Sequence, residues 1–257
     1  MKILMVGDIV GSPGRQVFGR VVTRMKKEKL TDFVVANAEN AAGGKGVTGP
    51  IAEELLSVGA DILTLGDHTW DQKELTPYIE KAERLIRPAN FPPGCPGSGL
   101  KILDVGLGSV AVINLVGRTF MQANDCPFRT VDAVLKKCAG VKTILVDFHA
   151  EATSEKIAMG RYLDGRVTCM VGTHTHVQTS DETLLPGGTA YITDLGMTGP
   201  KESVIGRDAK TILARFITGM PAKFIVASGN PVLEGIVIDV DNGTGKAFGI
   251  ERIRCSE

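Results

Sequence analysis

Short apolar runs alternate with longer amphipathic stretches along most of this chain of 257 residues. A short apolar run bounded by turn residues predicts a buried strand, and apolar positions three or four residues apart predict a helix. Strands are predicted at residues 2–8, 32–40, 61–68, 101–106, 109–117, 141–149 and 166–176. Helices are predicted at Arg15–Lys29, Pro50–Val58, Asp71–Glu83, Arg129–Lys137 and Ser154–Tyr162. This alternation is typical of a layered α/β fold.

The pattern changes after residue 200. A helix predicted at Asp208–Ile217 precedes the segment 224–230, and strands at 233–240 and 247–253 flank the turn 241–245 as a hairpin. No linker-like change in composition, internal repeat or long run of charge divides the chain. We therefore expect one domain spanning residues 1–257, which is long enough to bury a substantial core.

Composition and charge narrow the classes of partner. Lys+Arg and Asp+Glu number 29 each, so no global basic field indicates nucleic acid or a membrane, although a local basic patch would escape this count. The opening apolar run ends at Asp8, and no stretch approaches the ~20 apolar residues of a membrane span. The five cysteines are odd in number and show no CxxC spacing, which argues against a disulfide framework or a thiolate zinc site. We expect a cytoplasmic protein with no membrane partner.

Side chains suited to metal binding stand where the predicted strands end. In open α/β sheets the carboxyl ends of the strands meet at one edge, where loops direct side chains into a shared crevice. Five separate segments deliver such side chains, and all four histidines of the protein are among them. The residues are Asp8, Glu39, Asn40, Asp67, His68, His149, His174 and His176.

These residue types fit a particular group of metals. Imidazole and carboxylate together suit Mn, Fe, Zn or Co, whereas Mg and Ca prefer shells of oxygen alone. His174 and His176 are two apart, so in an extended segment they face the same way and can reach adjacent ions. The carboxylate of Glu39 or Asp8 can bridge two ions. Two ions ~3.5–4 Å apart lower the pKa of a bridging water and clamp the attacking and leaving oxygens of a phosphate ester.

Each of these residues also has a structural interpretation. A single histidine at a strand end is more often a hydrogen-bonded structural residue, and Asp8 and Asp67 each follow a glycine, as turn or N-cap residues do. Asn40 before Ala-Ala-Gly-Gly can be a turn former. The joint pattern nevertheless favours a dinuclear site, because independent structural roles would not place every histidine beside a strand end.

Eight motifs carry a family resemblance. In order and spacing, they resemble the YmdB-type branch of the bacterial calcineurin-like metallophosphoesterases, from Met1 to about Ile253. DFHAEATSEK together with GTHTHVQT is highly specific, whereas GDIVG alone is a weak signal. The motifs are GDIVGSPGR, NAENAAGGKG, GDHTWD, RPANFP, NLVGRTFM, DFHAEATSEK, GTHTHVQT and TDLGMTGP.

The resemblance implies a fold, a cofactor and a reaction. The fold would be a four-layer αββα sandwich. Two divalent ions, iron or manganese with zinc as an alternative, would serve hydrolysis of cyclic nucleotides, notably 2′,3′-cyclic AMP-type substrates, by attack of a metal-bridging hydroxide. The resemblance also implies a homo-oligomer. Its alternatives are a metal-dependent phosphomonoesterase or nuclease, and a regulatory metal- or nucleotide-binding protein with little turnover.

The resemblance also assigns roles to the strand-end residues. His68 matches the family's catalytic histidine, which protonates the leaving oxygen. The wider superfamily has a histidine two residues after the first Asp, but this chain has Val10 at that position. The resemblance implies that Asn40, from another segment, replaces this histidine as a metal ligand. One ion would be held by Asp8, Glu39, Asn40 and His176, and the other by Glu39, Asp67, His149 and His174.

The chain departs from the family at one position. The family pattern is Gly-Asn-His, whereas this chain has Gly66-Asp67-His68. Three carboxylates, two divalent ions and one hydroxide sum to zero charge, whereas an asparagine at position 67 would leave one positive charge for an anionic phosphodiester. We therefore expect tighter metal retention and weaker attraction of the substrate than in relatives with asparagine.

Two further residues are candidate substrate contacts. Arg118 ends a predicted strand and can contact a substrate phosphate, although a surface salt bridge is an alternative. Thr198 can line the pocket or serve a turn. Trp70 stands beside the site and can stack on a base, although a sole tryptophan is more often a core residue.

Overall fold

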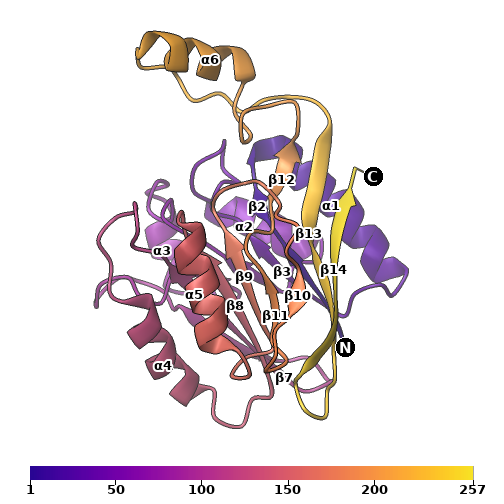
Figure 1. The fold of residues 1–257 in the computed structure, drawn as a ribbon. Coiled ribbons are helices and arrows are strands. Elements are labelled where there is room, and N and C mark those ends of the chain that lie inside the picture. Colours follow the sequence, from indigo (N-terminus) through magenta and orange to yellow (C-terminus); the bar gives the residue numbers. More distant parts are fainter. Residues whose placement is uncertain (257) are drawn as a thin grey trace.

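The computed structural model describes residues 1–256. Two β-sheets pack face to face, and helices cover their outer faces (Figure 1). The first sheet comprises β1 (Lys2–Val6), β2 (Asp8–Ile9), β3 (Phe33–Asn37), β4 (Ile62–Thr64), β5 (Leu85–Ile86), β12 (Met197–Pro200), β13 (Pro231–Val240) and β14 (Ala247–Cys255). The second comprises β6 (Leu100–Asp104), β7 (Ser109–Val116), β8 (Thr143–His149), β9 (Cys169–Thr173), β10 (Thr183–Leu184) and β11 (Ala190–Ile192). The expected αββα arrangement is confirmed.

The alternation of side chains along each central strand divides the core into three layers. On β1, Ile3 and Met5 enter the layer between the sheets, where Val112 and Val171 of the second sheet meet them. Leu4 and Val6 point the other way, toward α1 (Gly11–Lys27) and α2 (Gly49–Ser57). On the outer face of the second sheet, α4 (Pro127–Lys137) and α5 (Thr153–Leu163) cover a third apolar layer. Strands buried on both faces explain the nearly continuous apolar runs in the sequence.

The strand order brings the carboxyl ends of five strands to one region. In the first sheet β1, β3 and β4 are parallel neighbours, and in the second β7, β8 and β9 are parallel neighbours. The loops that follow β1, β3, β4, β8 and β9 therefore meet at the same end of the sandwich. Each of these strand ends carries a residue from the strand-end set, either as the last residue of the strand or within the three residues that follow it.

Two predicted helices differ from the observed ones. α1 begins at Gly11 and not at Arg15, because Pro13 is tolerated in the first helical turn, where its missing N–H would have no partner. α3 (Leu75–Ile79) is much shorter than the predicted Asp71–Glu83. Pro77 restricts how far this helix can extend before it, and residues 71–74 form turns.

Several short strands were not predicted, namely β2, β5, β10, β11 and β12, since runs of two to four residues carry too little pattern. The hairpin of β13 and β14 is confirmed. α6 (Ala209–Thr218) projects from the sandwich on a long excursion between β12 and β13 (Figure 1). All five cysteines are free. Among the helices of residues 1–256, none combines the length and apolar character needed to cross a membrane.

Candidate metal centre

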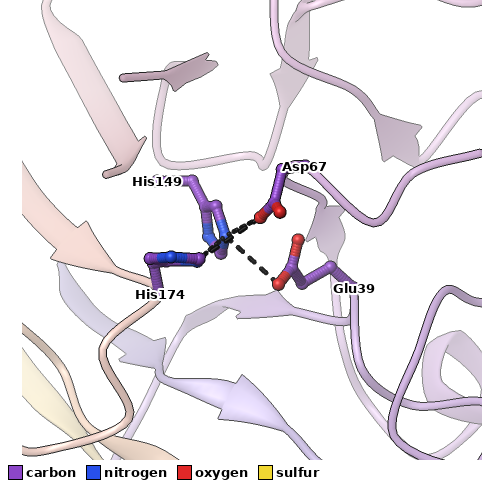
Figure 2. A group of neighbouring side chains, drawn as sticks. All are labelled: Glu39, Asp67, His149 and His174. Atoms are coloured by element: carbon purple, nitrogen blue, oxygen red, sulfur yellow. Dashed lines mark hydrogen bonds and ion pairs between the residues drawn. The ribbon is translucent and has the colours of Figure 1, made fainter. Parts of the chain in front are cut away.

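The structure gathers the strand-end residues at one place. Asp8 opens β2 directly after β1, Glu39 follows β3, Asp67 follows β4, His149 ends β8, and His174 follows β9. Figure 2 shows Glu39, Asp67, His149 and His174 converging from four different segments, and one ligand atom of each lies within 4.8 Å of the others. We call these four residues the His149 group.

The ring of His149 lies at the middle of this group. Its Nε2 lies 2.9 Å from His174 Nδ1, 3.0 Å from Asp67 Oδ1 and 3.1 Å from Glu39 Oε1. His149 is completely buried and Glu39 is almost so. The close approach depends on Gly66, because a Cβ there would lie 2.3 Å from both Glu39 Oε2 and His149 Cδ2.

A hydrogen-bond chain behind His149 sets its tautomer. The Thr173 hydroxyl donates to Asp147 Oδ1 at 2.8 Å, so its oxygen is left to accept from His149 Nδ1 at 2.9 Å. The hydrogen of the neutral ring therefore sits on Nδ1, and the Nε2 lone pair points into the group. Since the facing carboxylate oxygens are also acceptors, only a proton on a ring nitrogen or a metal cation satisfies this set.

A second convergence involves Asp8, Asn40 and His176, which we call the His176 group. His176 Nδ1 donates to the Ile205 carbonyl at 3.0 Å, so the lone pair of the neutral ring is on Nε2. This Nε2 lies 3.1 Å from Asn40 Oδ1 and 3.8 Å from Asp8 Oδ1. The Asn40 amide donates to the Gly44 carbonyl at 3.3 Å, which turns its oxygen toward His176. Here too acceptor atoms face one another.

Asp8 provides the clearest sign that a cation belongs here. Its side chain is completely buried, and Oδ1 has no hydrogen-bond partner, while Oδ2 accepts from the His174 backbone N–H at 3.1 Å. A buried carboxylate oxygen without a partner is costly unless a cation neutralises it. Oδ1 also lies 3.7 Å from His149 Nδ1, so Asp8 brings the His176 group next to the His149 group. The residues present therefore fit bound divalent metal.

The pKa shifts agree with this picture. Burial lowers the pKa of His149, but Glu39, Asp67 and Asp8 outweigh it and hold that pKa well above 6.5. Burial opposes ionisation of Asp67, but hydrogen bonds from His149 and His174 keep its pKa well below the ordinary value. For Asp8, burial prevails and raises the pKa above 3.8. Positive charge is therefore stabilised between these carboxylates.

The loop that carries His174 and His176 has a strained backbone. The φ angles of His174 and His176 are +99° and +62°, which lie in a region that residues other than glycine rarely adopt. Thr175 between them donates its backbone N–H and its hydroxyl to Asp194, which forms a buried ion pair of 2.6 Å with Lys156. Backbone strain of this kind persists where surrounding contacts enforce it, and it is common at functional sites.

A cavity of about 330 Å³ opens onto both groups. His68 lines it, with its Nδ1 3.1 Å from Asp71 Oδ2. The full lining is Val10, Glu39, Asn40, Gly44, His68, Glu151, His174, Thr175, His176, Ile205, Arg207 and Phe224.

Neither of the two candidate substrate contacts is among the residues that line this cavity. Arg118 is exposed on the surface and its guanidinium contacts Cys126 Sγ at 3.5 Å. Thr198 is completely buried, and its hydroxyl donates to the Glu234 carbonyl at 3.5 Å. Trp70 packs against the core and the Phe91 ring. Arg207 and Phe224 were missed, because they flank a helix far along the chain and no strand end marks them.

Thr173→Val tests the role of the hydrogen-bond chain formed by Asp147, Thr173 and His149. Losing the hydroxyl leaves His149 Nδ1 without an acceptor, so we expect metal affinity to fall about 10–100-fold. Thr64→Val is the matched control, because the Thr64 hydroxyl also donates to Asp147 but does not contact His149. Titration of both variants with Mn²⁺ measures the effect. An equal loss in the two variants would show that Asp147, and not the His149 tautomer, matters.

The fold and the centre together define a metallophosphoesterase-type protein. A family model described as YmdB-like protein matches residues 4–253, and the chain belongs to that family. It is 50% identical over 254 residues to a Bacillus subtilis protein described as 2′,3′-cyclic-nucleotide 2′-phosphodiesterase, covering 98% of this chain and 96% of the relative.

Two solved structures are similar over the same extent. A hypothetical protein from Thermus thermophilus superimposes with a TM-score of 0.94 at 41% identity, covering 99% of both chains. A structure described as a novel phosphatase of Mycoplasma pneumoniae has a TM-score of 0.94 at 33% identity, covering 99% of this chain and 93% of the other. The resemblance drawn from the motifs is confirmed.

Proposed function

We propose that this protein is a metal-dependent phosphodiesterase that uses two divalent cations to open cyclic nucleotides, most of all 2′,3′-cyclic ones. One observation carries the proposal. Two acceptor-rich groups, one of which includes the unpartnered Asp8 Oδ1, converge on a single cavity. The name of the Bacillus subtilis relative supports the choice of substrate.

The residues that would hold the cations follow from the two groups. Glu39, Asp67, His149 and His174 would hold one ion, and Asp8, Asn40 and His176 the other, with Glu39 shared between them. Imidazole with carboxylate favours iron or manganese, with zinc as the alternative. Bound ions would activate water and neutralise the charge that develops on the phosphate.

The chain's own residues would supply the proton. His68 lines the cavity, and since its Nδ1 is paired with Asp71, its Nε2 is the nitrogen left to face a substrate. The proposed role of Nε2 is to hold a proton and release it to the departing oxygen. The backbone N–H of His68 donates to Glu39 Oε2 at 3.2 Å, which ties the proton donor to the metal-binding carboxylate.

Metal analysis paired with turnover tests the proposal. The purified protein should contain two equivalents of iron or manganese and should hydrolyse 2′,3′-cyclic AMP. The substrate panel includes p-nitrophenyl phosphate, bis-p-nitrophenyl phosphate and an RNA oligonucleotide. Preference for the monoester or the RNA would favour a phosphomonoesterase or nuclease. A metal-replete protein without turnover would favour a regulatory role. The single domain, the cytoplasmic location and the homo-oligomer also stay predictions.

Asp67→Asn restores the residue that the family pattern contains. Removing one negative charge should lower KM for 2′,3′-cyclic AMP about fivefold and weaken metal binding by ~10-fold or more. Steady-state kinetics at saturating Mn²⁺ and a metal titration measure the two effects. Unchanged kcat/KM together with unchanged metal affinity would contradict the expectation.

A further inference from the structure

Arg207 is a cation in the cavity with no internal counter-ion. Of the described residues that line the cavity, it alone carries a permanent positive charge. Within residues 1–256, no carboxylate oxygen lies within 4.0 Å of its guanidinium nitrogens, whereas the buried Lys156 is paired with Asp194 and the half-buried Lys201 with Glu234. Burial, with Arg215 nearby, lowers the pKa of Arg207. A half-buried, unpaired guanidinium facing a cavity is suited to an anionic ligand.

The backbone fixes Arg207 close to the His176 group. The Ile205 carbonyl that orients the His176 ring lies two residues before it. Ile205 and Gly206 both have positive φ, and a Cβ at Gly206 would lie 2.8 Å from Val10 Cγ1. The segment is therefore wedged against Val10, which follows Asp8 by two residues. Isolated bridges join Arg207 to Val204 and Val226.

Phe224 holds the guanidinium in one orientation. The Arg207 guanidinium carbon lies 4.0 Å from the centroid of the Phe224 ring. That ring in turn packs against Gly44, where a Cβ would lie 2.3 Å from Phe224 Cε1. A guanidinium stacked on an aromatic face keeps its N–H edges free for bonds in its own plane.

We propose that Arg207 binds the phosphate oxygens of the substrate and that Phe224 orients it for this contact. The proposal rests on the proposed phosphodiesterase function, and it identifies the residue that selects an anion at this centre. The need for such a residue follows from the charges, because Asp67 lowers the net charge of the metal-loaded centre. A planar guanidinium can offer two parallel N–H donors to a phosphate.

The test compares phosphate binding with catalysis in the full-length protein loaded with Mn²⁺. Calorimetry with inorganic phosphate should show affinity falling roughly 10–100-fold in Arg207→Ala, with a similar rise in KM for 2′,3′-cyclic AMP and unchanged metal content. Arg207→Lys keeps the charge but not the paired donors, so its loss should be intermediate. Phe224→Leu should weaken binding in the wild-type background and add nothing to Arg207→Ala.

Arg215→Ala is the matched control, because it removes the same charge from an exposed position on α6. Phosphate affinity in Arg207→Ala equal to that of the wild type, or an equal loss in Arg215→Ala, would overturn the proposal. If Arg207→Ala loses metal, Arg207→Lys provides the same comparison. A wild-type protein that binds phosphate through Arg207 but turns over no cyclic nucleotide would refute the proposed function and leave the assignment of Arg207 intact.

Discussion

Replacing His68 with alanine should lower kcat for 2′,3′-cyclic AMP by about 10²–10⁴-fold while the protein keeps its metal. The loss is expected because the His68 side chain faces the cavity but belongs to neither acceptor group. Its backbone N–H, which bonds Glu39, is unaffected by the substitution. Metal content by elemental analysis and steady-state kinetics measure the two outcomes.

The leaving group separates a proton-donating role from a structural one. p-Nitrophenolate departs without a proton, so His68→Ala should lose far less activity on bis-p-nitrophenyl phosphate than on the cyclic nucleotide. Asp71→Asn is the companion variant, since it keeps an acceptor for His68 Nδ1 and should have a small effect. Equal losses on both substrates in His68→Ala would remove the general-acid role.

The sequence could predict the parts of the centre that lie at the carboxyl ends of strands. Asp8, Glu39, Asp67 and His149 each follow or end a strand whose apolar pattern is clear, and parallel pairing brings those ends together. The same runs predicted a layered α/β fold, whereas the arrangement in two sheets was predicted from the family resemblance. Helix boundaries were harder to predict, because Pro13 and Pro77 are tolerated within a first turn but resemble loop residues in a sequence.

Other parts depend on contacts between distant segments. Thr173 sets the His149 tautomer only because β8 and β9 are in register, and a threonine inside an apolar run carries no signal of that role. Arg207 reaches the cavity through a wedged backbone at Ile205 and Gly206, which no periodicity reveals. Thr198 lies within the motif TDLGMTGP, but pairing of β12 with β2 and β13 buries it. Tertiary contacts decide these positions.

Asp8→Asn should have opposite effects on activity and on the stability of the metal-free protein. Loss of an anionic ligand should remove several kcal/mol of charge stabilisation, which corresponds to a loss in kcat/KM on the order of 10³-fold. In the metal-free protein, the asparagine carbonyl can still accept from His174 N–H. Its amide would then occupy the place of the unpartnered Oδ1, 3.8 Å from His176 Nε2.

The stability gain should be about 1–3 kcal/mol, the usual cost of an unsatisfied buried polar group. For a chain of this size, each kcal/mol of added stability raises Tm by roughly 2–4 °C. The gain should grow with pH. Because burial raises the pKa of Asp8, the folded metal-free wild type binds more protons than the unfolded chain once the pH exceeds 3.8, and it loses stability as the pH rises further. Scanning calorimetry with a chelator, at several pH values, measures the difference.

A second buried aspartate provides the control that makes this result specific. Asp194 is as deeply buried as Asp8, but its carboxylate is paired with Lys156 and accepts from Thr175. Asp194→Asn would leave a buried ammonium without its partner, so it should destabilise the protein by about 3–5 kcal/mol with or without metal. If Asp8→Asn also lowers Tm in the presence of a chelator, Asp8 has a structural role. A rise in Tm coupled to lost turnover instead means that the fold tolerates a costly carboxylate at this position because a cation requires it.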